Sequence, residues 1–345
     1  MSFADSILGR LAINIHKSFL LKNYKLYGGA SLNVIFKLDG HLASRDFMEL
    51  SQNQLKHFKE EGFLLIRNAL TDNDLDAVVQ EYEKHIDQRA NELLDQGKLS
   101  QLYKDQPFER RLVCICKENN EIYPELDIMH LRGKASFDFL RNKNLMKIVT
   151  SIVGTEVTCS PIQHIRAKLP VGLTPGGADA HVAPWHQDAG VTWDEADPYF
   201  ILTVWIPFAE ATEENGCLQI IPRGHSRGLL EHHSKVGVGT TIIDKEITSQ
   251  AVLNLPMQKG SVLLMHKETP HRSTPNQSDT VRWSIDLRYQ QTGTPTGRPF
   301  HPDFVVYSQS NPSSVLEDHK KWSNMWIQAL ENSTGVQAHR WLQKS

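Results

Sequence analysis

The later part of the chain consists of short apolar or alternating runs between turn residues, and this texture constrains the fold more than any other feature. From Thr155 onward the runs are EVTCSPIQHIRAKL, YFILTVWIPFA, CLQIIPRG, SVLLMHK and RWSIDLRYQ. Their lengths and their β-branched content indicate strands. Asn215-Gly216 is a turn signal between two of them. Because no long helical pattern separates these runs, they predict an antiparallel sandwich or barrel.

The earlier part of the chain has mostly helical patterns. Apolar residues recur at helical spacing in 46–61, and GFLLIRNAL follows as a short strand. Thr71 is a good N-cap for a helix that runs to Gly97. We predict a further helix over 137–153.

These patterns predict one helical-plus-β unit rather than two separable domains. An N-terminal extension, residues 1–45, has apolar residues at helical spacing and should form an amphipathic helix. Residues 46–310 should form the β unit with its N-terminal helices. The tail, residues 311–345, should be helical and pack on the same domain through Trp322 and Trp326.

Charge and composition exclude several classes of partner. The chain has 345 residues and a net charge of −3 with no long basic run, so nothing indicates nucleic acid. No apolar run reaches the roughly 18 residues of a membrane span. Four irregularly placed cysteines predict a reduced, intracellular setting rather than a disulfide framework. We expect a cytoplasmic protein, with organelle targeting by the positively biased N-terminal helix as the alternative.

The stretch PWHQDA places an imidazole and a carboxylate two residues apart, at His186 and Asp188. Residues i and i+2 of an extended strand point to the same face, so these two side chains could share a proton or a metal ion. A third ligand could come from SVLLMHKETPHRS, which offers His266 and His271. Two histidines and one carboxylate suit an Fe(II) centre with open positions, although zinc stays possible.

Arg282 lies eleven residues after His271, on the next predicted strand. A guanidinium group there can bind a carboxylate through two parallel hydrogen bonds. A metal ion beside such an arginine is what a 2-oxo acid needs, because its keto-acid end can chelate the metal while its far carboxylate meets the arginine.

At this point the sequence resembles the phytanoyl-CoA dioxygenase family of Fe(II)- and 2-oxoglutarate-dependent oxygenases. The resemblance rests on FKEEGFLLIRNALTDNDLDAV, WHQDAG, VWIPFAEATEENGCLQIIPRGH and HRSTPNQSDTVRWSIDLRY, and it spans about 50–290. It implies a mainly β fold with flanking helices, a double-stranded β-helix, which is a cupin-like jelly roll. It also implies Fe(II), 2-oxoglutarate and O2 as cofactor and co-substrates, with ascorbate as a candidate reductant.

Carried over position by position, the resemblance implies a role for each matching residue. His186, Asp188 and His271 would hold the iron, and Arg282 would bind the distal carboxylate of 2-oxoglutarate with help from Ser273. The other implied co-substrate contacts are Trp205, Gln163 and Ile165, the last two on one face of the strand PIQHIRAKL with Ala167. His164, Arg166 and Lys168 would then face solvent or lie behind the site.

The implied reaction is hydroxylation or desaturation of an aliphatic C–H bond of a small molecule, with release of succinate and CO2. Asp188 favours this outcome over halogenation, which needs a small residue at that position. A zinc-dependent hydrolase and a non-catalytic ligand-binding member of the same fold are the alternatives. We expect the pocket entrance to be built from Arg132, Lys134, the loop 170–184 and the segment 191–200. The sequence does not identify the substrate or the oligomeric state.

Overall fold

The described strands form two facing antiparallel sheets, as predicted, and helices cover the outside of the larger one. The computed structural model describes residues 19–26, 31–37, 49–173, 182–235, 239–334, 336 and 340. Every strand pairing that it describes is antiparallel. The architecture is the jelly roll expected from the sequence.

The larger sheet has the strand order β14-β4-β13-β6-β11-β3, and β5 also pairs with β13. The smaller sheet has the order β12-β7-β10-β1-β2, and β8 and β9 form a separate two-stranded sheet. The strands are β1 (Phe19–Leu26), β2 (Ser31–Lys37), β3 (Phe63–Ile66), β4 (Glu156–Cys159), β5 (His164–Lys168), β6 (Ile201–Pro207), β7 (Leu218–Ile220), β8 (His232–Lys235), β9 (Gly239–Ile242), β10 (Ala251–Leu255), β11 (Val262–His266), β12 (His271–Ser273), β13 (Arg282–Gln291) and β14 (Phe304–Ser308).

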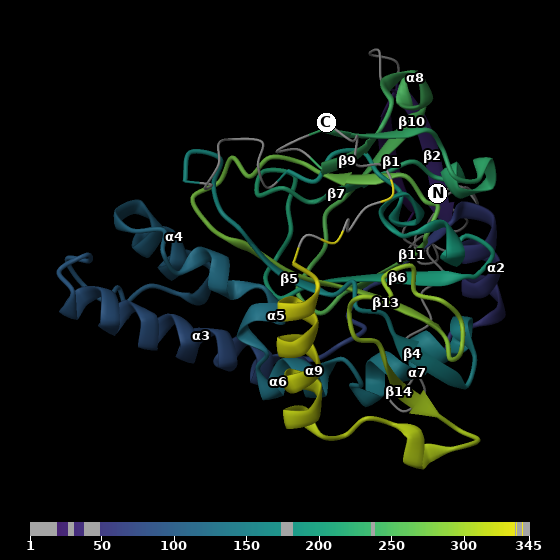
Figure 1. Ribbon diagram of the computed structural model, residues 1–345. Coiled ribbons are helices and arrows are strands. Elements are labelled where there is room, and N and C mark those ends of the chain that lie inside the picture. Colours follow the sequence, from purple (N-terminus) through teal and green to yellow (C-terminus); the bar gives the residue numbers. More distant parts are fainter. Residues whose placement is uncertain are drawn as a thin grey trace, which may run out of the picture.

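Helices α3, α4, α6, α7 and α9 lie on one side of the larger sheet and the smaller sheet lies on the other, with the short α8 beside β10 (Figure 1). The α-helices are α2 (Gln52–Glu61), α3 (Asp72–Asp95), α4 (Phe108–Glu118), α5 (Ile128–Leu131), α6 (Lys134–Phe139), α7 (Lys143–Val153), α8 (Asp244–Ile247) and α9 (His319–Asn332). Short 3-10 helices are η1 (Tyr123–Leu126), η2 (Asp188–Val191), η3 (Asp194–Ala196), η4 (Gly224–Arg227) and η5 (Pro312–Ser314).

Successive side chains of strand β13 point alternately into the helical layer and into the space between the two sheets. Its apolar residues Trp283, Ile285 and Leu287 are fully buried in the main core, together with apolar residues of α3 and α7. Its polar residues have the other parity and therefore point between the two sheets. A jelly-roll interior that is lined by charged groups from a central strand is a place for a ligand, since isolated buried charges are costly.

The helix predicted over 137–153 is two helices, α6 and α7, so that prediction was wrong. Asn142 lies between them and accepts hydrogen bonds from the backbone N–H groups of Asn144 (2.9 Å) and Leu145 (3.0 Å). This N-cap satisfies amide groups that would otherwise be unpaired at the start of α7. A local polar cap therefore interrupted an apolar pattern that continues through it.

The helix predicted for the N-terminal extension is not found in its described part. Strands β1 and β2 pair with each other there, and β1 also pairs with β10. The alternation of Leu32, Val34 and Phe36 suits a strand, and Gly28-Gly29 in the sequence disfavours a continuous helix. Residues 1–18, where the amphipathic pattern is strongest, lie outside the described residues.

Helix α9 of the C-terminal tail packs on the helical layer through two tryptophans. Trp322 and Trp326 of α9 are fully buried, and the ring centroid of Trp322 lies 5.2 Å from that of Phe137 in α6. All four cysteines are free, as expected for structural residues. No helix within the described ranges is long and apolar enough to cross a membrane.

Candidate functional site

A cavity of about 490 Å³ lies between the two sheets of the jelly roll. Residues of β5, β6 and β13 in the larger sheet form one wall, and residues of β7 and β12 form the opposite wall. Tyr123 of η1, His130 of α5 and Asp127, which lies between these two helices, line one side. The cavity therefore contains the predicted site residues His186, His271, Ser273, Trp205 and Arg282.

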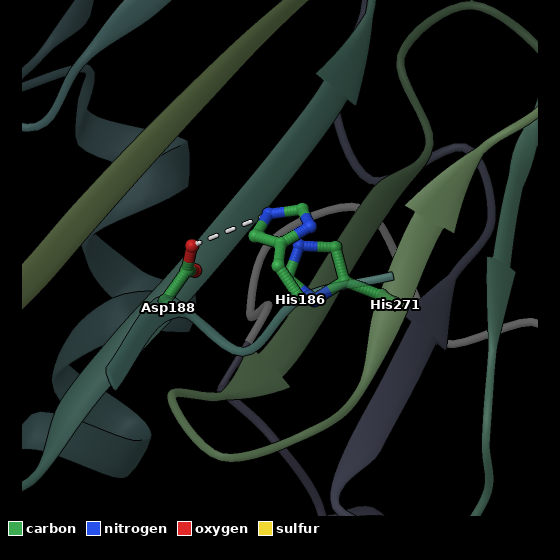
Figure 2. Close-up of side chains that lie close together, drawn as sticks. All are labelled: His186, Asp188 and His271. Carbon is green, nitrogen blue, oxygen red and sulfur yellow. Dashed lines mark ion pairs between the residues drawn. The ribbon is translucent and has the colours of Figure 1, made fainter. Parts of the chain in front are cut away.

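His186, Asp188 and His271 converge at one point, as predicted. One ligand atom from each lies within 4.8 Å of the other two, and the rings of the two histidines are 4.2 Å apart between centroids. Figure 2 shows the carboxylate facing His186, whose Nε2 is 3.9 Å from Asp188 Oδ1. Gln187 between them is extended (φ −114°, ψ 142°), so the two side chains share a face.

Backbone pairing brings the third ligand to this point. His186 and His271 form a two-residue antiparallel bridge, with N–H···O distances of 3.0 Å in both directions. His266 is not part of the cluster; its ring contacts Phe200 and His225 instead. The choice of His271 over His266 thus agrees with the geometry. His225 and His232 also lie outside the cluster.

Each histidine is oriented by its own backbone. His186 Nδ1 is 2.8 Å from the carbonyl oxygen of Pro184, and His271 Nδ1 is 3.0 Å from that of Thr269. Since a carbonyl can only accept, each Nδ1 carries the proton, and each Nε2 presents its lone pair to the cluster. Burial, followed by the nearby His271, lowers the pKa of His186 to about 3, so its ring stays neutral and able to bind a metal ion.

Asp188 is held by two neighbours on the larger sheet. Arg288 donates from Nη2 to Oδ1 (2.7 Å) and from Nε to Oδ2 (3.2 Å), and the Thr203 hydroxyl also donates to Oδ2. Thr203 and Arg288 face each other across β6 and β13. Burial alone would raise the pKa of Asp188, but the charge of Arg288 outweighs burial and holds it below the ordinary value. The carboxylate is therefore ionised and fixed.

Arg288 extends this contact into a chain of alternating charges. Its Nη1 donates to Asp286, whose other oxygen accepts from Arg166 Nε at 2.7 Å. Burial would raise the pKa of Asp286, yet Arg166 and Arg288 lower it. Arg288 and Asp286 were not among the predicted site residues. The polar alternation of Arg282, Ser284, Asp286 and Arg288 in RWSIDLRYQ was the sequence signal for them.

Arg282, at the far end of the cavity, has different surroundings from Asp188. Its guanidinium group lies 5.3 Å from the ring centroid of Trp205, and its Nη1 donates to Ser284 Oγ at 2.5 Å. Its buried Nε has no hydrogen-bond partner, and Arg282 forms no ion pair within the described part of the chain. Burial, then the charge of Arg166, lowers its pKa to about 10, so it remains a cation.

Of the three residues predicted on the pocket face of strand β5, two border the cavity and one does not. Ile165 and Ala167 point into the main core, although both border the cavity. Gln163 precedes β5, is fully buried, and is not among the residues that line the cavity. Because Lys168 pairs with Arg282 and His164 pairs with Asp286 across the strands, the polar face of β5 is the one that looks inward.

Ser273 lines the cavity, whereas several residues predicted for the entrance do not. Ser273 is buried at the far end of the cavity and accepts a hydrogen bond from Lys168 Nζ at 2.7 Å. Arg132, Lys134 and the segment 191–200 are not among the residues that line the cavity. Trp193 packs on Phe300 instead, and Asp197 pairs with Arg340. Residues 174–181 of the predicted entrance loop lie outside the described residues.

The donor set at the metal end fits iron, and the far end fits an anion. Two imidazoles and one carboxylate are the ligand set of Fe(II) centres that keep positions open for other ligands. The buried, unpaired Nε of Arg282 needs an acceptor that the described residues do not supply. A 2-oxo acid with a second carboxylate satisfies both requirements in one molecule.

Comparisons with known proteins agree with this geometry. A family model described as phytanoyl-CoA dioxygenase (PhyH) matches residues 58–284. Phytanoyl-CoA dioxygenase domain-containing protein 1 of Mus musculus is 30% identical over 272 residues, which are 70% of this chain and 90% of that protein. Its Dictyostelium discoideum homolog is 24% identical over 272 residues, 70% of this chain and 92% of that protein.

Among solved structures, the non-heme monooxygenase ThoJ in its apo form is similar in fold. It covers 81% of this chain and 95% of its own, with a TM-score of 0.54 and 18% sequence identity. This likeness supports the jelly-roll architecture.

Proposed function

Because the chain belongs to the phytanoyl-CoA dioxygenase family, we propose that it is an Fe(II)- and 2-oxoglutarate-dependent oxygenase that hydroxylates or desaturates an aliphatic C–H bond of a small molecule. One observation carries this proposal. A single cavity has three metal-binding side chains at one end and, at the other, a buried arginine to which the described residues supply no acidic partner. A zinc hydrolase would have no use for the second feature.

The proposed division of labour follows from the contacts. His186, Asp188 and His271 would hold Fe(II), which supplies oxygen activation coupled to decarboxylation of 2-oxoglutarate to succinate and CO2. Arg288 and Thr203 keep Asp188 ionised and oriented. Arg282, supported by Trp205 and Ser284, would bind the distal carboxylate and so fix the direction of the co-substrate.

The substrate would enter from the side of the cavity that η1 and α5 border. Tyr123, Leu126 and Asp127 border the cavity there, and they offer a phenol, an apolar face and a carboxylate. This mixture suits a small molecule with both apolar and polar parts. The walls around the metal ligands are mostly buried, which helps to keep bulk water from the reacting bond.

The decisive experiment is an anaerobic ultraviolet-visible titration of the metal-free protein with Fe(II) and then with 2-oxoglutarate. We expect a weak visible charge-transfer band with 2-oxoglutarate and none with succinate, which lacks the keto group. Screening of candidate substrates by succinate release would follow. Tight zinc binding without such a band would instead favour the hydrolase alternative.

A further inference from the structure

Lys168 and Arg282 are two buried basic side chains at the far end of the cavity. They face each other across β5 and β13, and each is only 3–4% exposed. Within the described residues, neither forms an ion pair with a carboxylate. A buried charge without a counter-charge is costly. Two basic side chains next to each other therefore indicate a binding site for an anion.

The amine of Lys168 is fixed in position by neutral oxygens. Its Nζ donates to Ser273 Oγ at 2.7 Å and to the carbonyl oxygen of Thr274. Ser273 Oγ also accepts from the backbone N–H of Ala183 at 3.1 Å. Lys168 therefore reaches the one serine that the sequence had associated with the distal carboxylate.

Gly216 gives the lysine its path along this wall. Its φ of +94° is one that other residues rarely adopt. A Cβ there would lie 2.6 Å from the carbonyl oxygen of Thr274 and 3.1 Å from the side chain of Lys168. The Asn215-Gly216 turn thus leaves room for an aliphatic stem that ends in the cavity.

The groups that face Lys168 disfavour its charged form. Burial, then the charges of Arg282 and Arg166, lower its pKa to about 6, and only Cys217 acts in the opposite direction. With no anion bound, the amine is therefore mostly neutral above this pH. A carboxylate placed between Lys168 and Arg282 would supply the missing negative charge and favour the ammonium form.

We propose that Lys168 is a second cationic contact for the distal carboxylate of the bound 2-oxo acid, beside Arg282, and that it takes up one proton from solvent when this carboxylate binds. The inference rests on the proposed function and deepens it. It explains why a lysine stands on an inward strand position where it has no acidic partner. The only bond change in this step is the transfer of one proton from water or buffer to the Lys168 amine.

The first test uses the wild-type protein, loaded with Mn(II) in place of iron, and isothermal titration calorimetry at pH 8. 2-Oxoglutarate is titrated in two buffers with different enthalpies of ionisation, and pyruvate, which lacks a distal carboxylate, is the control ligand. We expect uptake of about one proton per 2-oxoglutarate and none with pyruvate. A binding enthalpy of 2-oxoglutarate that does not depend on the buffer would overturn the proposal.

The second test compares Lys168→Met with Lys168→Arg and with Lys56→Met, an exposed control on α2. We expect Lys168→Met to weaken 2-oxoglutarate binding roughly 10- to 100-fold and to leave pyruvate and Mn(II) binding unchanged. Lys168→Arg should retain most of the affinity without proton uptake, and Lys56→Met should behave as wild type. Equal loss of both ligands in Lys168→Met, or no loss, contradicts the proposal.

These outcomes separate the two levels of inference. A wild-type protein that binds no 2-oxoglutarate overturns the proposed function and this role of Lys168 together. A wild-type protein that binds it without proton uptake overturns only the role of Lys168. Because the wild-type measurement needs no variant, it decides the question even if Lys168→Met fails to fold.

Discussion

The two ends of the cavity differ in how their buried charged side chains are paired. At the metal end, Asp188, Arg288, Asp286 and Arg166 alternate in sign and bind one another. At the far end, Arg282 and Lys168 stand next to each other, and the described residues give them neutral hydrogen-bond partners. The first arrangement is complete within the protein, whereas the second becomes complete only with a ligand.

This difference teaches how a fold can combine stability with binding. A balanced buried network supports the structure, because the loss of one member leaves an uncompensated charge. An unbalanced pair works against stability, and the free energy of unfolding should rise when it is removed. Sites that await a ligand commonly show this conflict between stability and function. Four experiments test the contrast, from the largest effect to the smallest.

Replacement of Asp188 by Ala should have the largest effect. The cluster loses its only carboxylate ligand, so we expect Fe(II) affinity to fall and turnover to fall by at least about 1,000-fold. The fold should persist, since Arg288 keeps its bond to Asp286. Asp194→Ala on η3 is the exposed control. Calorimetric metal titration and circular dichroism check both points, and unchanged metal affinity would contradict the assignment.

Replacement of Arg288 by Met should break the balanced end. Asp188 then loses both of its guanidinium contacts, and we expect the free energy of unfolding to fall by about 3–5 kcal/mol. Denaturant unfolding of the metal-free protein measures this change. Arg110→Met, which removes an exposed ion pair with Asp279, is the matched control and should have a much smaller effect. A similar loss in both variants would mean that the buried network is not special.

Replacement of Arg282 by Leu should have the opposite sign on stability. Removal of a buried cation without an ion pair should raise the free energy of unfolding by about 1–2 kcal/mol. The same change should weaken 2-oxoglutarate binding by roughly 30-fold or more, because the distal carboxylate loses its main partner. Metal affinity should not change. Destabilisation by several kcal/mol would show that Arg282 has a structural role instead.

The smallest expected effect is the pH dependence that Lys168 contributes. Its pKa is about 6 in the folded protein and near 10.5 when unfolded, so the unfolded chain binds the extra proton between these values. The contribution of Lys168 to the free energy of unfolding is therefore most favourable above pH 10.5. It becomes less favourable as the pH falls towards 6. The stability advantage of Lys168→Met over wild type should be larger at pH 8 than at pH 9, by on the order of 1 kcal/mol. A constant difference across this range would show that the amine does not titrate there.

The convergence of His186, Asp188 and His271 could be predicted, as could the position of Arg282 in the same cavity. Short spacings and the resemblance to a known family defined these residues. Strand β5 shows where this reasoning stopped. The period-2 rule correctly grouped His164, Arg166 and Lys168 on one face, but it could not tell which face looks into the cavity. The register of β5 against β13 made that decision.

By itself, the sequence determined the strand-rich texture, the helix start at Thr71, and the local geometry of His186-Gln187-Asp188. These features depend on neighbours within a few residues. Only the tertiary structure decided that Arg288 binds Asp188, 100 residues away, and that Lys168 lies beside Arg282 and Ser273. Strand register determines which of these side chains meet. Register depends on segments that are far apart in the chain, and so does the presence or absence of a counter-charge beside each buried charge.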